Sequence, residues 1–114
     1  DGHTFEHYCA GLLRKNGFHH VEVTRGSGDQ GIDLLLKRHF RKIGIQVKCY
    51  SYPVGNAAVQ EAVAGKKYYK TDKVAVVTNN RFTKSAIALA EANDVELIDR
   101  DGLLILIENA KKKR

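Results

Sequence analysis

The sequence predicts an α/β protein: one mixed β-sheet flanked by helices, with the element order αβββαβαβα. Two segments in which apolar and polar residues alternate, 32–37 and 43–49, lie one hairpin apart and predict antiparallel strands. The run 74–77 is short and continuously apolar, as expected of a strand that is covered on both faces. A helical pattern separates this run from a further strand pattern, which predicts a parallel crossover.

The N-terminal segment predicts a helix that follows Thr4 as its cap and ends at Gly17. Its apolar residues recur at the spacing of one helical face; they are Phe5, Tyr8, Cys9, Leu12 and Leu13. A first strand follows, in which Val21 and Val23 alternate with polar residues. Three glycines within 26–31 predict the turn into the second strand.

The second and third strands carry the polar residues of greatest interest. Their apolar faces consist of Ile32, Leu34 and Leu36 in one strand and of Ile43, Ile45, Val47 and Cys49 in the next. Because side chains alternate along a strand, Asp33 lies on the opposite face of the second strand, and Gln46 and Lys48 lie together on the opposite face of the third. If the two apolar faces align, these three polar side chains converge on one site.

A break at 51–55 precedes a second helix, which we expect Asn56 to cap and which ends near Tyr68 or Tyr69. The residues that this helix turns toward the core are predicted to be Val59, Ala62 and Val63.

Thr83 is predicted to cap a third helix, after which 95–98 forms the last strand. The apolar face of that helix consists of Ala86, Ile87 and Ala90. Asp101 then starts a final helix that is apolar over 103–107. We expect one domain, 1–110, followed by a basic tail, 111–114.

The composition indicates where such a domain acts. The chain contains no methionine, so we expect it to be cut from a longer protein with an additional domain. No segment resembles a signal peptide or a membrane span, and we expect no membrane contact from this segment. Cys9 and Cys49 both fall on apolar faces, which predicts buried, unpaired thiols and a reducing, cytoplasmic location.

The net charge of +6 favours a polyanionic partner, most often nucleic acid, with a basic solvated surface as the alternative.

The element order, with Asp33 on the second strand and Gln46 and Lys48 on the third, resembles the restriction-endonuclease-like nuclease superfamily. The signature of that superfamily is an acid, then an acid or Gln, one further residue and Lys. More closely, nearly the whole chain resembles the catalytic domain of Mrr-type endonucleases. The matching segments are 5–6, 28–33, 46–48, 54–55, 59–61, 78–79, 82–83 and 97–99.

The resemblance implies metal-dependent hydrolysis of DNA, in restriction of foreign or modified DNA, with Mg²⁺ or Mn²⁺ as cofactor. It makes Asp33 the main metal-binding carboxylate and gives Lys48 the role of orienting or activating the water and stabilising charge on the phosphate. The carbonyl of Val47 is a further candidate ligand, since a strand exposes it beside the site. A homodimer is one candidate assembly for cleavage of both strands.

Four assignments keep two explanations each. Gln46 either ligates the metal or supports the site by hydrogen bonding, because an amide contributes no charge where many relatives carry an acid. Glu6 either supplies the missing charge or is an acid that favours the helix dipole in a first turn. Asp29 is either a turn residue among glycines or a residue near the ion or the phosphate of the substrate. Gln60 either contacts the substrate or Lys48, or is an exposed helical residue.

Two other functions compete with the nuclease. A structure-selective DNA resolvase of the same superfamily would share the site. A non-catalytic DNA-binding module would have a decayed site; Asp33 and Lys48 argue against decay, whereas the neutral Gln46 leaves it open.

Overall fold

The computed structural model describes residues 2–24 and 30–112. The elements are α1 (Gly2–Lys15), β1 (His19–Val23), β2 (Leu34–Arg38), β3 (Arg41–Lys48), α2 (Asn56–Tyr69), β4 (Lys73–Thr78), α3 (Lys84–Ala92), β5 (Val95–Ile98) and α4 (Arg100–Lys112). This is the predicted order αβββαβαβα. Within the described ranges, no helix is long and apolar enough to cross a membrane.

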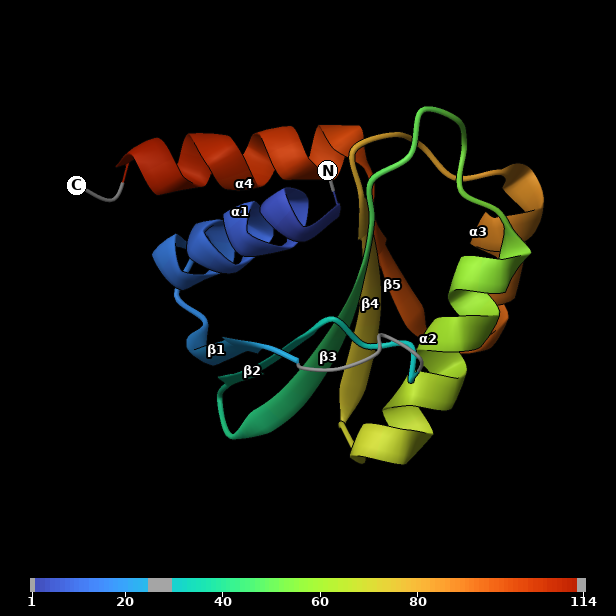
Figure 1. The fold of residues 1–114 in the computed structure, drawn as a ribbon, viewed down its shortest axis with the longest axis horizontal. Helices are drawn as coiled ribbons and strands as arrows, with labels where there is room; N and C mark the ends of the chain where they lie inside the picture. Colours follow the sequence, from blue (N-terminus) through green and yellow to red (C-terminus); the bar gives the residue numbers. More distant parts are fainter. Residues whose placement is uncertain (1, 25–29, 113–114) are drawn as a thin grey trace.

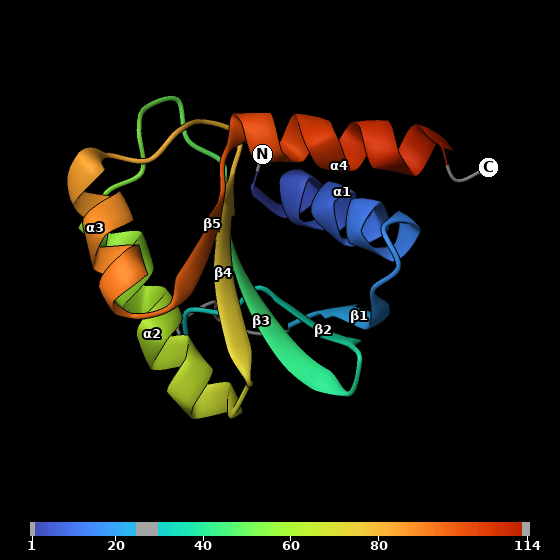
Figure 2. The same ribbon diagram turned by 180° about the vertical axis from the view of Figure 1, so that it is seen from behind.

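One five-stranded sheet organises the molecule, with its strands in the spatial order β1-β2-β3-β4-β5. The pairs β1–β2 and β2–β3 are antiparallel, whereas β3–β4 and β4–β5 are parallel. Helices α1 and α4 lie side by side on one face, and α2 and α3 cover the other (Figures 1 and 2). The prediction of a mixed sheet flanked by helices is therefore confirmed.

Each face of the sheet has its own apolar core. Toward α1 and α4, the buried residues include Cys9, Leu12, Leu13, Leu34, Leu36, Ile45, Val47, Ala75, Val77 and Leu103. Toward α2 and α3, they include Ile32, Val59, Ala62, Val74, Val76, Ala86 and Ala90. Strand β4 contributes to both cores, which explains why 74–77 is continuously apolar instead of alternating.

Two glycines let the chain ahead of β2 lie directly on α2. Gly31 has a φ of +78°, and a side chain there would overlap the backbone oxygen of Glu61. A side chain on Gly65 would lie 2.6 Å from the backbone oxygen of Gln30. This close approach holds the segment that leads into Asp33 against the middle of α2.

The predicted ends of two helices are confirmed. Thr83 caps α3, because its hydroxyl oxygen accepts a hydrogen bond of 3.0 Å from the backbone N–H of Ala86. Gly17, with a φ of +90°, follows the last turn of α1, where the N–H of Phe18 donates to the carbonyl of Leu13.

Three predicted helix starts are wrong. Helix α1 already begins at Gly2, so Thr4 lies inside it. Asn56 is the first residue of α2 and is not its cap, a position that Gly55 takes without a side-chain hydrogen bond. In α4 the cap is Asp99, whose carboxylate accepts from the N–H of Gly102 at 3.0 Å, and Asp101 lies in the first turn.

The face prediction fails for Ile32, because the chain bends before β2 begins and turns this side chain toward α2 rather than toward α1. Cys49 is exposed, since it lies beyond the end of β3, where the alternation stops. Tyr8, Val63 and Ile87, which were expected in the core, are exposed by 49%, 36% and 51% respectively.

Helix α4 continues through Lys112, so the first two residues of the predicted basic tail are helical, and the predicted domain boundary stays a prediction.

Candidate active site

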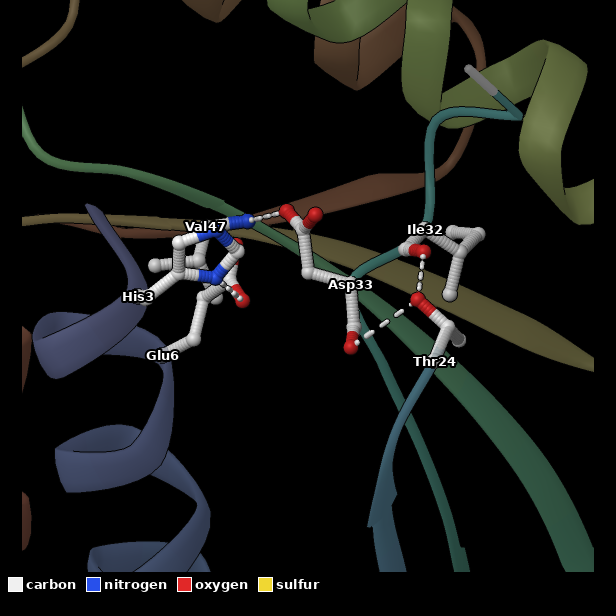
Figure 3. A network of polar contacts seen from close by, with 6 residues as sticks. All are labelled: His3, Glu6, Thr24, Ile32, Asp33 and Val47. Atoms are coloured by element: carbon white, nitrogen blue, oxygen red, sulfur yellow. Dashed lines mark hydrogen bonds and ion pairs between the residues drawn. The ribbon is translucent and has the colours of Figure 1, made fainter. Parts of the chain in front are cut away.

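Asp33 stands immediately before β2, where its backbone bridges two neighbouring strands. Its N–H donates to the carbonyl of Ile45 at 2.8 Å, and its carbonyl accepts from the N–H of Thr24 at 2.9 Å. The Asp33 carboxylate accepts from the backbone N–H of Val47 at 2.7 Å (Figure 3). The carboxylate thus accepts the hydrogen bond that a neighbouring strand would otherwise accept at the end of β3, and this bond fixes the position of the side chain.

Glu6 approaches the same point from α1, as Figure 3 shows, and its side chain is 17% exposed. Burial raises the pKa of Glu6, and the negative charge of Asp33 raises it further, while His3, 3.6 Å from the carboxylate, lowers it. Because α1 begins at Gly2, Glu6 lies in the second turn, so the dipole of the first turn no longer accounts for it.

The pKa of Asp33 is also raised, mainly by burial. The N–H of Val47, the ammonium of Lys48 and a hydrogen bond with Glu6 oppose this increase in the pKa, whereas the carboxylate of Glu61 adds to it. Two partly buried carboxylates therefore lie close enough to affect each other's pKa, an arrangement that favours either a retained proton or a bound cation.

Gln46 and Lys48 project from the opposite face of β3 toward α2, as predicted, and meet Glu61 there. One carboxylate oxygen of Glu61 accepts from the Gln46 amide at 2.8 Å and from the Lys48 ammonium at 3.1 Å. Burial lowers the pKa of Lys48, but the hydrogen bond and charge of Glu61 outweigh it, so the pKa of Lys48 is raised overall. Lys48 therefore stays protonated.

Glu61 is the site residue that sequence reasoning missed, because Gln60 was chosen on the same helix. Gln60 is exposed, whereas Glu61 reaches both Gln46 and Lys48. The available signal was spacing: Glu61 lies three residues after Ala58 and four before Gly65, both buried on the face of α2 that packs on the sheet.

The remaining predicted residues are placed as follows. The Val47 N–H points toward Asp33, and because a strand residue directs its N–H and C=O to the same side, the carbonyl of Val47 opens toward Asp33 as well. Asp29 lies outside the described residues. The structure thus brings Asp33, Glu6 and Val47 together, with Gln46 and Lys48 on the α2 side of the same point.

The donor set fits a hard divalent cation. Gln46 is 3% exposed, and its side-chain oxygen has no hydrogen-bond partner among the described residues. The oxygens of Asp33, Glu6 and Val47 are hard donors as well. In the described part of the chain no three His, Cys, Asp or Glu residues form a metal-binding group, yet Mg²⁺ is usually held by one or two carboxylates together with water and substrate phosphates.

Comparison with known proteins gives a family match. A model of the Mrr catalytic domain, described as restriction endonuclease, matches residues 1–107. The comparison with curated protein sequences gives no match.

Solved structures share the fold. The crystal structure of AF1548, a protein of unknown function, has 20% identity and a TM-score of 0.80, covering 95% of this chain and 66% of that one. The DNA modification-dependent restriction endonuclease AspBHI has 20% identity and a TM-score of 0.72, covering 95% and 31% respectively. The MspJI restriction endonuclease, in complex with a 27-mer oligonucleotide, has 20% identity and a TM-score of 0.70, covering 97% and 28%. The chain thus spans about a third or less of these two endonucleases.

Proposed function

Because this chain belongs to the Mrr catalytic-domain family of restriction endonucleases, we propose that it is a divalent-metal-dependent endonuclease that hydrolyses DNA phosphodiester bonds. The observation that carries the proposal is the convergence of Asp33, Glu6 and Lys48 at the end of β3. Two carboxylates beside an ammonium match the demand of this reaction, in which a cation and a phosphate must be held together. The net charge of +6 supports a polyanionic substrate.

Asp33 and Glu6 would hold the ion through their carboxylates, with the side-chain oxygen of Gln46 and the carbonyl of Val47 as neutral donors. When bound, Mg²⁺ or Mn²⁺ supplies Lewis-acid stabilisation of charge on the phosphate and lowers the pKa of water. The N–H of Val47 fixes the orientation of the Asp33 carboxylate before any ligand arrives. The backbone thus orients one of the two carboxylates that would hold the ion.

Lys48 acts on the substrate from the α2 side of the site. Its ammonium is protonated and lies at the rim, with 20% of the side chain exposed, where it stabilises negative charge that develops on the phosphate. Glu61 positions it, and the same carboxylate oxygen also orients the amide of Gln46. The side chain of Gln46 is thereby turned so that its amide nitrogen binds Glu61 and its oxygen remains available.

The proposal extends to the setting of the reaction. We place the activity in restriction of foreign or modified DNA, in the reducing cytoplasm, with target choice in an additional domain. Support for the last point comes from AspBHI and MspJI, of which this chain spans 31% and 28%. A homodimer would supply a second centre for cleavage of the opposite strand.

A plasmid assay tests the proposal. Supercoiled DNA is incubated with the chain in Mg²⁺, in Mn²⁺ and in excess chelator, and binding is measured in parallel by gel retardation. We expect nicked or linear products only with a divalent ion. Equal retardation in all three conditions with no cleavage in any would identify a non-catalytic DNA-binding module instead.

A further inference from the structure

Two tyrosines after β3 form a tilted ring pair that the proposed reaction does not use. The rings of Tyr50 and Tyr52 lie 4.7 Å apart, centroid to centroid, with an interplanar angle of 30°. Tyr50 is half-buried against the core on the α2 side, whereas Tyr52 is 59% exposed. Tyr52 therefore rests on Tyr50 with one side of its ring, and much of its surface is open to solvent.

The loop that carries this pair is fixed by the neighbouring loop after β4. The N–H of Tyr50 donates to the side-chain oxygen of Asn79 at 2.8 Å, and the amide of Asn80 donates to the carbonyl of Tyr50 at 3.3 Å. Further along, Val54 and Phe82 form an isolated parallel bridge between the two loops. Figure 1 shows both loops rising together beyond the ends of β3 and β4. The aromatic surface is thus pre-organised.

This surface adjoins the proposed centre. The ammonium of Lys48 lies 5.7 Å from the centroid of the Tyr50 ring, and Tyr50 contributes to raising the pKa of Lys48. Arg81, exposed on the loop that anchors Tyr50, adds positive charge at the same edge of the sheet. A strand whose phosphate reaches Lys48 would bring its flanking bases next to Tyr52.

We propose that Tyr50 and Tyr52 form a stacking platform for a nucleobase of the DNA strand being cut, beside the phosphate at Lys48. The inference rests on the proposed nuclease function and adds a substrate class to it. Tyrosine rings stack on bases irrespective of sequence, and the open face of Tyr52 extends the stack from Tyr50. A base within a duplex is already stacked on its neighbours, so the platform accepts a single-stranded, unpaired or extruded base.

The chain provides a matched control pair. Tyr68 and Tyr69 at the end of α2 lie 4.9 Å apart, but their rings meet edge to face at 77°. Tyr68 is 61% exposed, close to the value for Tyr52, and Lys66 and Lys67 precede it. Substitution of Tyr68 therefore removes an equally exposed tyrosine near positive charge without touching the platform.

The test uses the 114-residue chain in chelator, so that DNA is bound and not cut. Single-stranded oligonucleotides with 2-aminopurine at successive positions report stacking by quenching, and anisotropy reports affinity. We expect Tyr52→Ala to weaken binding about 5- to 150-fold, from the usual cost of removing one base–aromatic stack, and to abolish the quenching at one position. Tyr52→Phe should retain both signals, and Tyr68→Ala should leave both unchanged.

Three results would overturn the platform. The first is that the wild-type protein quenches 2-aminopurine at no position, and the second is that Tyr52→Ala binds DNA within twofold of the wild type and still quenches. The third is that Tyr68→Ala loses as much affinity and quenching as Tyr52→Ala does. These outcomes are independent of the plasmid assay. If the chain quenches 2-aminopurine fluorescence through Tyr52 but cuts no plasmid, the stacking platform is supported and the proposed nuclease function is refuted. A chain that cuts plasmid with no role for Tyr52 would refute the platform alone.

Discussion

The pairing of Gln46 with Glu61 yields the most specific prediction of the structure. Gln46 on β3 is neutral, and the negative charge beside it stands on α2, where a carboxylate oxygen of Glu61 accepts from the Gln46 amide at 2.8 Å. Gln46→Glu alone would set two carboxylates face to face. Gln46→Glu combined with Glu61→Gln would restore a carboxylate–amide pair with the donor and acceptor exchanged.

The magnitude follows from the contact that is lost. A hydrogen bond to a charged group contributes about 1.5 to 3 kcal/mol, and the low end applies here because the side chain of Glu61 is 50% exposed. Gln46→Glu should therefore lower the free energy of unfolding by about 1.5 kcal/mol, which corresponds to about 6 °C in Tm for a chain of 114 residues. In the exchanged double variant, we expect a coupling energy above about 1 kcal/mol in the stabilising direction.

Thermal and denaturant unfolding of the four proteins in chelator, at neutral pH, measures this cycle. Gln60→Glu is the matched control, since it introduces the same charge on an exposed neighbour in α2 and should change stability by less than about 0.5 kcal/mol. The prediction fails if Gln46→Glu has the same Tm as the wild type, or if the effects of the two substitutions on the free energy of unfolding are additive within error. In either case the contact between Gln46 and Glu61 does not stabilise this site.

Three further predictions concern single positions. The raised pKa of Glu6 means that its contribution to stability is present at low pH and is lost as pH rises from its ordinary value of 4.5 through the folded value. Glu6→Gln should therefore raise the Tm of the chelated protein at pH 7 more than at pH 4; an equal gain at both would refute the shift. Burial raises the pKa of Cys9 to about 12, whereas Cys49 is exposed, so a thiol reagent should label only Cys49 in the folded protein. Labelling that persists in Cys49→Ser without denaturant would contradict this. Phe40 is fully exposed in the hairpin turn at a φ of 66°, so Phe40→Gly should raise the free energy of unfolding by about 1 kcal/mol; a lower Tm would show that the ring packs.

Patterns with long, regular periods were predictable from the sequence. The apolar run of β4, the hairpin β2–β3 and the helical periods determined the element order and the sheet. Strand alternation predicted that Gln46 and Lys48 share the α2 face of β3, whereas Asp33 reaches the same region from the bend before β2, through its hydrogen bond with the N–H of Val47. Each of these features is local, or depends on one pairing whose register is set by apolar faces.

The errors arise where the outcome depends on contacts between distant segments. Ile32 leaves the predicted face because the chain bends over Gly31 to lie on α2, a contact that no local period encodes. Glu61 was missed for the same reason, since its partners lie on β3. Helix α4 starts at Arg100, one residue before the predicted start at Asp101, because the carboxylate of Asp99 accepts from the N–H of Gly102 and caps the helix.

The measurement that tests the central claim most directly is metal-dependent nicking by Asp33→Asn. Asparagine retains an acceptor for the N–H of Val47 but removes the negative charge, so folding and DNA retardation should persist. We expect cleavage to fall at least about 100-fold in Mg²⁺ and in Mn²⁺. The control variant Glu91→Gln, which removes a charge from an exposed position of α3, should cleave as the wild type does. Wild-type cleavage by Asp33→Asn would contradict the assignment of this site.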